Sequence, residues 1–418
     1  MARNASVMVP CTAVIAGLPF TAQAQDYSEF RNTNLSAQLG SRPAFLVDQL
    51  VDGQLKEELQ SCRTRVFRKN DFSIGHRGAC MQFPEHTLES YVAAARQGAG
   101  ILECDVTFTA DQELVCRHSQ CDLHTTTDIV TRPELNAKCT TPWEPGVEPT
   151  CCTSDITLAE YRTLRGKMDS SGNPATATTP EEYAYGGTAD WRTDLYQSQS
   201  TGTLMTHAES AALFRTLRVG ITPELKSPSV EMPFNGFSQD DYRQKLIDEL
   251  RTAGIDPSRA WVQSFNIEDV RYWIANTPDF GEQAVYLEGN YNDPPDAAEL
   301  ESYKAEGINY YAPPTFMLVE SGGADGVEFV STQLATDAKS AGLKLIAWTL
   351  ERTGPRADLN TNSPPFYWQS LGPVIADRPN EGLVLEMVDA LAQDVGVEGI
   401  FSDWPATTTF YANCKRLP

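Results

Sequence analysis

Short apolar segments of this sequence carry acidic residues whose types and spacing could bind a divalent cation. Glu103 and Asp105 stand two residues apart in one such run, so in a strand their side chains share a face. Glu224 ends another run. Three oxygen ligands suit Ca²⁺ or Mg²⁺ better than zinc. Because buried carboxylates are costly without a cation, we predict that these three bind one divalent metal ion and do not form an ordinary solvated acidic face.

Two of the five histidines follow strand-like runs and could form an acid–base pair that cleaves a phosphate ester. His76 follows residues 72–75, and His118 follows residues 114–117. Imidazole titrates near neutral pH, so one ring can deprotonate an attacking oxygen while the other protonates the leaving alkoxide. We predict that both are catalytic. The remaining histidines lack such placement and are interpreted as structural or pocket-lining: His86, His124 and His207.

Charged residues beside these groups could hold a phosphate. Arg77 offers a fork of donors to phosphate oxygens, and Lys226 offers a point charge from beside Glu224. Both could also be salt-bridge partners of the carboxylates, and the two roles are compatible. Glu85 precedes a helical segment and could orient Arg77 or His76.

The elements that must position these residues alternate along the chain. From residue 72 onward, strand-like apolar runs alternate with helical ones, which is typical of a parallel sheet built from β–α repeats. Helices are expected at 41–60, 87–97, 239–253, 267–276, 325–341 and 379–393. Strands are expected at 72–76, 100–107, 219–225, 260–265, 283–288, 307–311, 343–350 and 399–403. These units predict an α/β fold, a (β/α)8 TIM barrel, which places its active site at the carboxyl ends of the strands.

The spacing of the strands predicts an inserted subdomain after the second strand. We place it at about 108–215, beginning with a turn and a returning strand at 114–118. Long structured insertions at this face of a barrel usually shape the substrate pocket. The remaining chain is divided into an N-terminal extension at 25–71 and a phosphodiesterase barrel domain at 72–418.

The first 24 residues have the features of an export signal. Arg3 precedes an apolar run at 7–20, and Ala22-Gln23-Ala24 has the form of a cleavage site. No later run reaches the ~20 apolar residues of a membrane helix. We therefore expect a soluble, secreted or periplasmic protein without a transmembrane segment. The formal net charge of −23 makes nucleic acid an unfavourable partner.

The ten cysteines fit an exported protein, in which disulfides persist. Cleavage would remove Cys11 and leave an odd number, so at least one thiol would be free or paired between molecules. We assign the free thiol to Cys104, which alternates away from the face that the carboxylates share. The other eight could form four disulfides, with Cys62 and Cys414 tying the two ends together. The spacings between the cysteines do not form the paired C-x-x-C motifs of a zinc site. We therefore expect a local cluster to form disulfides within the insertion, namely Cys116, Cys121, Cys139, Cys151 and Cys152.

Taken together, these segments resemble the glycerophosphodiester phosphodiesterase family. The resemblance covers about residues 72–405 and rests on His76-Arg77-Gly78, Pro84-Glu85-His86-Thr87, Glu103-x-Asp105-Val106, Thr109-x-Asp111, His118, Glu224-x-Lys226, Gln263-Ser264-Phe265, Ala347-Trp348-Thr349 and Phe401-Ser402-Asp403-Trp404-Pro405. It implies the same barrel with its insertion, and it maps the family's metal ligands, catalytic histidines and phosphate contacts onto the residues predicted above. Two positions depart from the family pattern, Ser119 and His124.

The resemblance implies metal-dependent hydrolysis of a small glycerophosphodiester, such as glycerophosphocholine, to glycerol 3-phosphate and an alcohol. Direct attack by water and initial attack by the glycerol hydroxyl, which gives a cyclic phosphate, both fit these residues. Trp348, Phe401 and Trp404 would line the pocket and contact a trimethylammonium group, or else they belong to the barrel core.

Two alternatives stay open. One is a secreted lysophospholipase D or sphingomyelinase-D-like enzyme, which would act at a lipid surface and would need an exposed apolar rim. Pieces of such a rim would be Phe234, Phe237, Phe316, Met317 and Leu318. The other is a catalytically silent binding module, which would usually lack a histidine or a metal ligand, and this sequence lacks neither.

Overall fold

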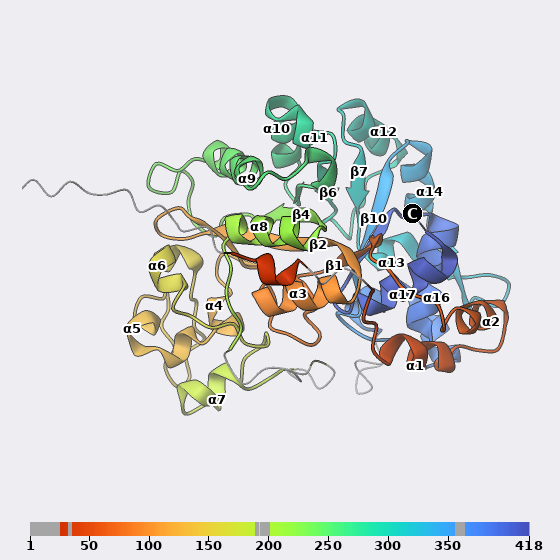
Figure 1. Ribbon diagram of the computed structural model, residues 1–418, viewed down its shortest axis with the longest axis horizontal. Helices are drawn as coiled ribbons and strands as arrows, with labels where there is room; N and C mark the ends of the chain where they lie inside the picture. The colour runs from red at the N-terminus through yellow and green to blue at the C-terminus, as the bar shows by residue number, and fades with distance from the viewer. Residues whose placement is uncertain (1–25, 32–35, 189–191, 193–200, 356–363, 418) are drawn as a thin grey trace, which may run out of the picture.

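The computed structural model describes residues 26–31, 36–188, 192, 201–355 and 364–417, and a closed parallel barrel forms its centre (Figure 1). The expected signal sequence at 1–24 lies outside the described residues. Strand β1 pairs with both β2 and β11, which closes the barrel. The barrel strands are β1 Asn70–Gly75, β2 Ala99–Phe108, β4 Gly220–Leu225, β5 Gln263–Ser264, β6 Val285–Leu287, β7 Tyr310–Ala312, β10 Lys344–Leu350 and β11 Gly399–Ser402. The predicted (β/α)8 TIM barrel is confirmed.

The apolar runs form strands because both of their faces are covered. Every residue of β2, β4 and β11 is buried, as expected where helices cover the outside and side chains fill the inside of a parallel barrel. Each of the eight expected strands corresponds to one barrel strand, although several are shorter than expected. The sequence pattern therefore identifies the strands better than it identifies their ends.

Helices surround the barrel in an outer layer (Figure 1). The helices after the strands are α3 Leu88–Arg96, α8 His207–Leu217, α9 Gln239–Ala253, α10 Ile267–Asn276, α11 Pro278–Gly281, α12 Ala297–Ala305, α13 Thr315–Leu318, α14 Gln333–Ser340, α15 Gly372–Asp377, α16 Leu383–Asp389 and α17 Ala406–Lys415. Helix α3 begins where Thr87 accepts a hydrogen bond from the amide of Ser90, an N-cap that stabilises the first turn. Within the described residues, no helix is long and apolar enough to cross a membrane.

Two of the expected helices differ in the structure. The segment 325–341 begins with a strand, β9 Glu328–Ser331, which pairs with β8 Val319–Gly322, and only then forms α14. Its alternating, β-branched start favours a strand. The segment 41–60 forms two helices, α1 Arg42–Gln49 and α2 Gln54–Ser61, because the chain turns at Gly53 between them.

The residues between β2 and α8 form a separate layer beside the barrel. Strand β3 Leu114–Cys116 returns antiparallel to β2, as predicted, and the short helices α4 Leu123–Thr126, α5 Pro133–Asn136, α6 Leu158–Tyr161 and α7 Pro180–Ala184 follow. This layer has its own apolar core, which includes Leu123, Trp143 and Tyr161. Helix α8 packs on β2 and β4 instead and so belongs to the barrel.

Four disulfides lie within the described part of the chain, and one assignment from the sequence is wrong. Cys62–Cys414 joins the two ends as expected, and Cys121–Cys152 and Cys139–Cys151 lie in the insertion. Cys104 is not free but pairs with Cys116. Its side chain does point away from the carboxylates, but the position of β3 on that side could not be anticipated. The cysteine left free among the described residues is the buried Cys80.

Candidate active site

One pocket at the carboxyl ends of the barrel strands collects most of the predicted site residues. Its volume is about 70 Å³. One side of its wall is charged and comes from β1, β2, β4 and the end of β3, whereas the other side is mainly aromatic. The lining residues are His76, Arg77, Glu103, His118, Glu224, Gln263, Phe265, Leu287, Trp348, Thr349, Tyr367 and Phe401.

The three carboxylates predicted as metal ligands converge beside this pocket. Side-chain oxygens of Glu103, Asp105 and Glu224 all lie within 4.8 Å of one another, and the three residues are buried. Glu103 and Asp105 share one face of β2, and the parallel register with β4 sets Glu224 beside Asp105. The barrel therefore builds a compact all-oxygen cluster from two neighbouring strands.

The donor set of this cluster fits one hard divalent cation. Asp105 Oδ1 is buried and has no hydrogen-bond partner among the described residues. Burial, together with the charges of Asp105 and Glu224, raises the pKa of Glu103 well above its usual range. Burial also raises the pKa of Glu224 to about 8. A cation would compensate this excess of negative charge and use the unpartnered oxygen, and oxygen ligands alone favour Ca²⁺ or Mg²⁺.

His76 is held in a fixed orientation at the end of β1. Its Nδ1 lies 2.5 Å from Asp403 Oδ1, and its Nε2 lies 3.8 Å from Glu103 Oε2. Burial alone would raise the pKa of Asp403, but the charges of His76 and Arg352 hold that pKa well below its usual range. An ionised Asp403 keeps a proton on Nδ1 and leaves Nε2 on the side of the carboxylate cluster and the pocket.

His118 reaches the same pocket from β3. The amide of Arg117 donates to the carbonyl oxygen of Asp105 at 2.7 Å, so the residue before His118 is fastened to the strand that carries two of the carboxylates. Burial and the positive charges of Arg77 and Lys226 lower the pKa of His118 well below its usual range. The two predicted catalytic histidines therefore lie on one pocket, and both follow strands, β1 and β3, that pair with the edge of β2 opposite to β4.

Arg77 lines the pocket and is held by three carboxylates. Its amide donates to Glu103 Oε2 at 2.9 Å, and its Nη1 donates to Glu85 Oε2 at 3.0 Å. Its buried Nε makes no hydrogen bond within the described residues but forms an ion pair with Asp105 Oδ2 at 3.5 Å. The chain turns here through Gly78, whose φ is +91° and where an added Cβ would lie 2.3 Å from Ser90 Oγ. A guanidinium beside a pocket is suited to an anionic group.

Lys226 and Glu85 lie behind the pocket wall. Lys226 Nζ is 2.6 Å from Glu224 Oε1 and 5.7 Å from the centre of the Phe265 ring. Burial alone would lower the pKa of Lys226, but Glu224 and Asp105 raise it. Glu85 contacts Arg77 and not the pocket, so it orients the guanidinium, which is one of the two roles considered for it.

The aromatic side of the pocket continues outward to the surface. The ring centroid of Trp348 lies 5.6 Å from that of Phe265 and 6.1 Å from that of Tyr367, and both of these residues line the pocket. It also lies 6.2 Å from the ring centroid of Tyr291, which in turn lies 5.7 Å from that of Phe366. Tyr291 is 36% exposed and Phe366 is 44% exposed. We call Tyr291, Phe316 and Phe366 the aromatic rim.

The pieces of an apolar rim expected from the sequence are mostly buried. Phe316 is 8% exposed and contacts the rim residues, but Phe237, Met317 and Leu318 lie in the interior. Phe234 packs against Phe108 instead of lining the pocket. The loops after β6 and β10 supply the exposed rings, and no periodic pattern marks them in the sequence.

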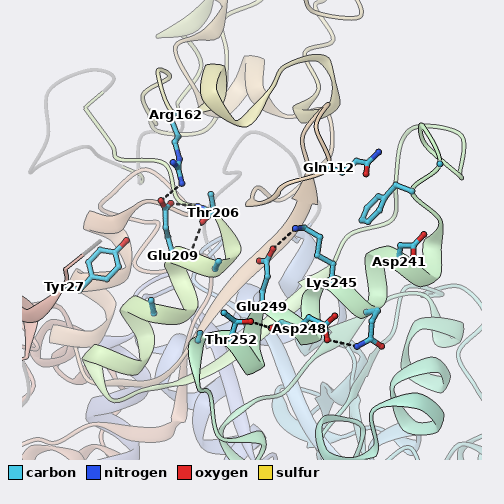
Figure 2. A pocket seen from close by; sticks show the side chains of 16 residues that line it. Tyr27, Gln112, Arg162, Thr206, Glu209, Asp241, Lys245, Asp248, Glu249 and Thr252 are labelled. Atoms are coloured by element: carbon cyan, nitrogen blue, oxygen red, sulfur yellow. Dashed lines mark hydrogen bonds and ion pairs between the residues drawn. The ribbon is translucent and has the colours of Figure 1, made fainter. Parts of the chain in front are cut away.

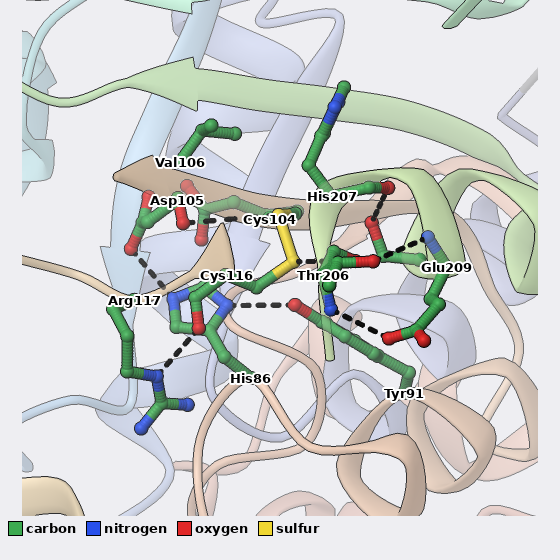
Figure 3. The surroundings of a disulfide bond; sticks show 12 residues. His86, Tyr91, Cys104, Asp105, Val106, Cys116, Arg117, Thr206, His207 and Glu209 are labelled. Carbon is green, nitrogen blue, oxygen red and sulfur yellow. Dashed lines mark hydrogen bonds and ion pairs between the residues drawn. A yellow bond between two sulfur atoms is a disulfide. The ribbon is translucent and has the colours of Figure 1, made fainter. Parts of the chain in front are cut away.

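Trp404 and three histidines lie outside the pocket. Trp404 was expected to contact substrate, but its ring packs against the guanidinium of Arg42 at 4.9 Å because the chain turns outward after β11. His86 Nε2 contacts Asp105 Oδ2 at 2.8 Å and its Nδ1 contacts Tyr91, so this histidine orients a predicted metal ligand (Figure 3). His124 accepts a hydrogen bond from the amide of Cys151, and His207 pairs with Glu249.

A larger groove of about 890 Å³ lies elsewhere on the barrel, between α8 and α9 (Figure 2). None of the predicted catalytic or metal-binding residues lines it. Its charged groups satisfy one another: Arg162 pairs with Glu209 at 2.7 Å, and Lys245 pairs with Glu249 at 3.3 Å. The groove is larger, but the predicted catalytic histidines line the smaller pocket.

Comparison with known proteins agrees with this geometry. Residues 76–407 match the glycerophosphoryl diester phosphodiesterase family. The chain belongs to this family. An extracellular protein from Arthroderma benhamiae is 42% identical over 246 residues, which is 58% of this chain and 97% of the relative. A glycerophosphodiester phosphodiesterase from Arabidopsis thaliana is 28% identical over 256 residues, which is 59% of this chain and 61% of the relative.

Solved structures of phosphodiesterases share the fold of this family member. A phosphodiesterase from Oleispira antarctica, in complex with the product sn-glycerol-3-phosphate, is 18% identical with a TM-score of 0.50. That comparison covers 81% of this chain and 96% of the other. At this level of identity the similarity supports the barrel fold alone.

Sequence reasoning missed several residues that support the site. Asp403 and Gln263 stand within motifs that we noted, yet their contacts with His76 and Glu103 exist only after the barrel closes. Arg352 follows β10 and bridges Asp403 and Asp169, which joins the insertion to the catalytic end of the barrel. Isolated charges in irregular segments gave no signal for these contacts.

Proposed function

We propose that the protein hydrolyses glycerophosphodiesters to glycerol 3-phosphate and an alcohol, with one divalent cation and the pair His76 and His118. The observation that carries this proposal is the convergence of two histidines, three buried carboxylates and one arginine on a single pocket. A silent binding module is a weaker interpretation because it would have no need to maintain such costly buried charges.

The residues of the pocket support distinct steps of this reaction. One histidine would remove the proton from the attacking hydroxyl or water, and the other would donate a proton to the leaving alcohol. Asp403 supports His76 in this exchange, because it fixes Nδ1 and leaves Nε2 available. Arg77 lines the pocket and would hold a phosphoryl oxygen through its guanidinium.

The cation would be held by Glu103, Asp105 and Glu224. When bound, it supplies positive charge that stabilises the negative charge developing on the phosphoryl group. Lys226 pairs with Glu224, favours its ionised form and orients it for this role. His86 orients Asp105 through a contact of 2.8 Å.

The direct test measures release of glycerol 3-phosphate from glycerophosphocholine. Protein stripped of metal with a chelator is assayed alone and after addition of Ca²⁺ or Mg²⁺. The proposal expects release only with a divalent cation. If the folded protein releases no glycerol 3-phosphate from any glycerophosphodiester with either ion, the proposal is wrong.

The aromatic rim favours a second candidate, a lysophospholipase D acting on a lipid with one acyl chain. Exposed rings next to an active-site pocket lose unfavourable contact with water when they cover an apolar chain. Such an enzyme would contact a lipid surface through Tyr291 and Phe366. Comparison of initial rates on lysophosphatidylcholine and glycerophosphocholine, below the micelle concentration, separates the two candidates.

We also propose that the protein acts outside the cytoplasm, either secreted or periplasmic. Four disulfides, the signal-like segment 1–24 and the similarity to an extracellular protein support this location. The division into an extension at 25–71 and a barrel domain at 72–418, with an insertion at about 108–215, is part of the same proposal. Mass spectrometry of the exported protein should find Gln25 at its N-terminus.

A further inference from the structure

The disulfide Cys104–Cys116 joins the strand of two predicted metal ligands to the segment that leads to His118. Figure 3 shows the disulfide with Asp105, one of these two ligands. Cys104 is the residue between Glu103 and Asp105 on β2. Cys116 is the last residue of β3 and stands two residues before His118. One covalent bond therefore joins the segment that carries two ligands to the segment that carries an acid–base group.

Strand β3 is short, and besides the disulfide the amide of Arg117, just after it, bonds to the carbonyl oxygen of Asp105. It has three residues, and it lies at the end of the strand order with β2 as its ladder partner. On its other side a single bridge joins Val115 to Thr206, with the amide of Cys116 donating to the carbonyl oxygen of Met205 at 3.0 Å. A short ladder at a sheet edge opens more readily than a central strand.

The disulfide acts from the outer face of the strand, away from the substrate. Cys104 and Cys116 are both fully buried, in a core cluster that includes Tyr91 and Phe214 of the covering helices. Because side chains alternate along β2, the carboxylates point to the opposite face. The disulfide cannot touch substrate or metal, so any effect on catalysis must act through the position of the strands.

We propose that Cys104–Cys116 is a positioning crosslink that holds His118 in register with Glu103 and Asp105. The inference rests on the proposed function, because it takes these three residues as the acid–base group and two metal ligands. Misplacement of a catalytic group by about 1 Å can lower the rate by about a hundredfold, so a link of this kind has a measurable effect.

The chain contains a matched control for this proposal. Cys139–Cys151 lies in the insertion and closes a loop of the same length, since both pairs are separated by 12 positions. In the chain-entropy description the stabilisation from a disulfide depends on loop length, so the two bonds are matched in this respect, and Cys139–Cys151 lies within the loop that Cys121–Cys152 also closes. Only one of the two adjoins the proposed metal ligands. A difference in catalysis between the two deletions therefore reports position and not general stability.

The experiment compares C104A/C116A with C139A/C151A and the wild-type protein. Thermal unfolding gives Tm, calorimetric titration of stripped protein with CaCl₂ and MgCl₂ gives metal affinity, and glycerophosphocholine assays well below the lowest Tm give kcat and KM. We expect both variants to have a lower Tm. We expect C104A/C116A alone to lose about tenfold or more in kcat with KM nearly unchanged, and to bind metal several-fold more weakly.

Equal kcat and equal metal affinity in the two variants would overturn the proposal. Should C104A/C116A fail to fold, C104V/C116A restores part of the lost side-chain volume and replaces it in the comparison. If neither folds while C139A/C151A does, the crosslink serves folding and the proposal is wrong. If the wild-type protein binds metal but hydrolyses no glycerophosphodiester, the proposed function fails, and the comparison of metal affinities still decides the inference.

Discussion

The two walls of the pocket differ in origin as well as in chemistry. The charged wall comes from the carboxyl ends of β1, β2 and β4 and the residues just after them, where Arg77 and Gln263 both hydrogen-bond to Glu103. The aromatic wall starts at Phe265 and Trp348 and continues to Tyr291 and Phe366, which lie in the connections after β6 and β10. In a barrel enzyme the rigid strand ends suit the reaction and the loops suit recognition of the substrate. The walls should therefore respond differently to substitution.

The largest effect is expected from the acid–base pair on the charged wall. Replacing His76 by Ala removes the imidazole that Asp403 orients, and kcat should fall by about a thousandfold because general acid–base catalysis contributes on this scale. KM should change little. The measurement is the initial rate of glycerol 3-phosphate release with metal in excess.

His124→Ala provides the control for this prediction. His124 is a histidine of the insertion that contacts the amide of Cys151 and does not line the pocket. Its replacement should leave kcat within about twofold of the wild-type value, as for a substitution away from the reacting groups. Equal losses in the two variants would show that the pocket is not the active site.

Replacing one metal-binding carboxylate by its amide should raise Tm relative to wild type without metal and lower the gain in Tm that added metal gives. In E103Q the stripped protein loses a carboxyl whose ionised form is opposed by burial and by the charges of Asp105 and Glu224, so its Tm should rise above that of the stripped wild-type protein. Gln263 can accept the new amide by rotating, because its Oε1 has no hydrogen-bond partner among the described residues and its Nε2 already contacts Glu103.

Added Ca²⁺ or Mg²⁺ should raise the Tm of the wild-type protein but not that of E103Q. Ligand binding to the folded state stabilises it in proportion to the logarithm of ligand concentration over Kd, so loss of one ligand removes the shift. A metal-induced shift of equal size in both proteins would contradict the assignment of Glu103 as a ligand.

How far the sequence alone predicts this molecule depends on whether a contact follows from strand periodicity. Glu103, Asp105 and Glu224 were predicted together because alternation and parallel strand order place them on one face. The partner of Cys104 was not, because it depends on where β3 returns against β2. Of the aromatic rim only Phe316 was expected, because Tyr291 and Phe366 lie in irregular connections whose positions follow from tertiary packing and not from spacing along the chain.

A smaller effect is expected from the carboxylate that orients His76. In D403N the amide cannot stabilise the protonated ring, and kcat should fall by about a hundredfold with KM nearly unchanged. Gln97→Ala is a useful control, since Gln97 is buried nearby and contacts the amide of Ala406 but no catalytic group. A rise in KM without loss of kcat in D403N would place Asp403 in substrate binding instead.

The smallest effect should appear on the aromatic wall, and only with a substrate that reaches the rim. In Y291A/F366A, KM for lysophosphatidylcholine should rise about tenfold, which corresponds to ~1.4 kcal/mol and is in the range for lost apolar contact. KM for glycerophosphocholine and kcat for both substrates should stay near wild type. Val66→Ala, at another exposed apolar position, controls for general surface effects. If KM rises equally for both substrates, the rim supports the structure of the pocket and does not select the substrate. The division between a charged wall for the reaction and an aromatic wall for substrate recognition would then be wrong.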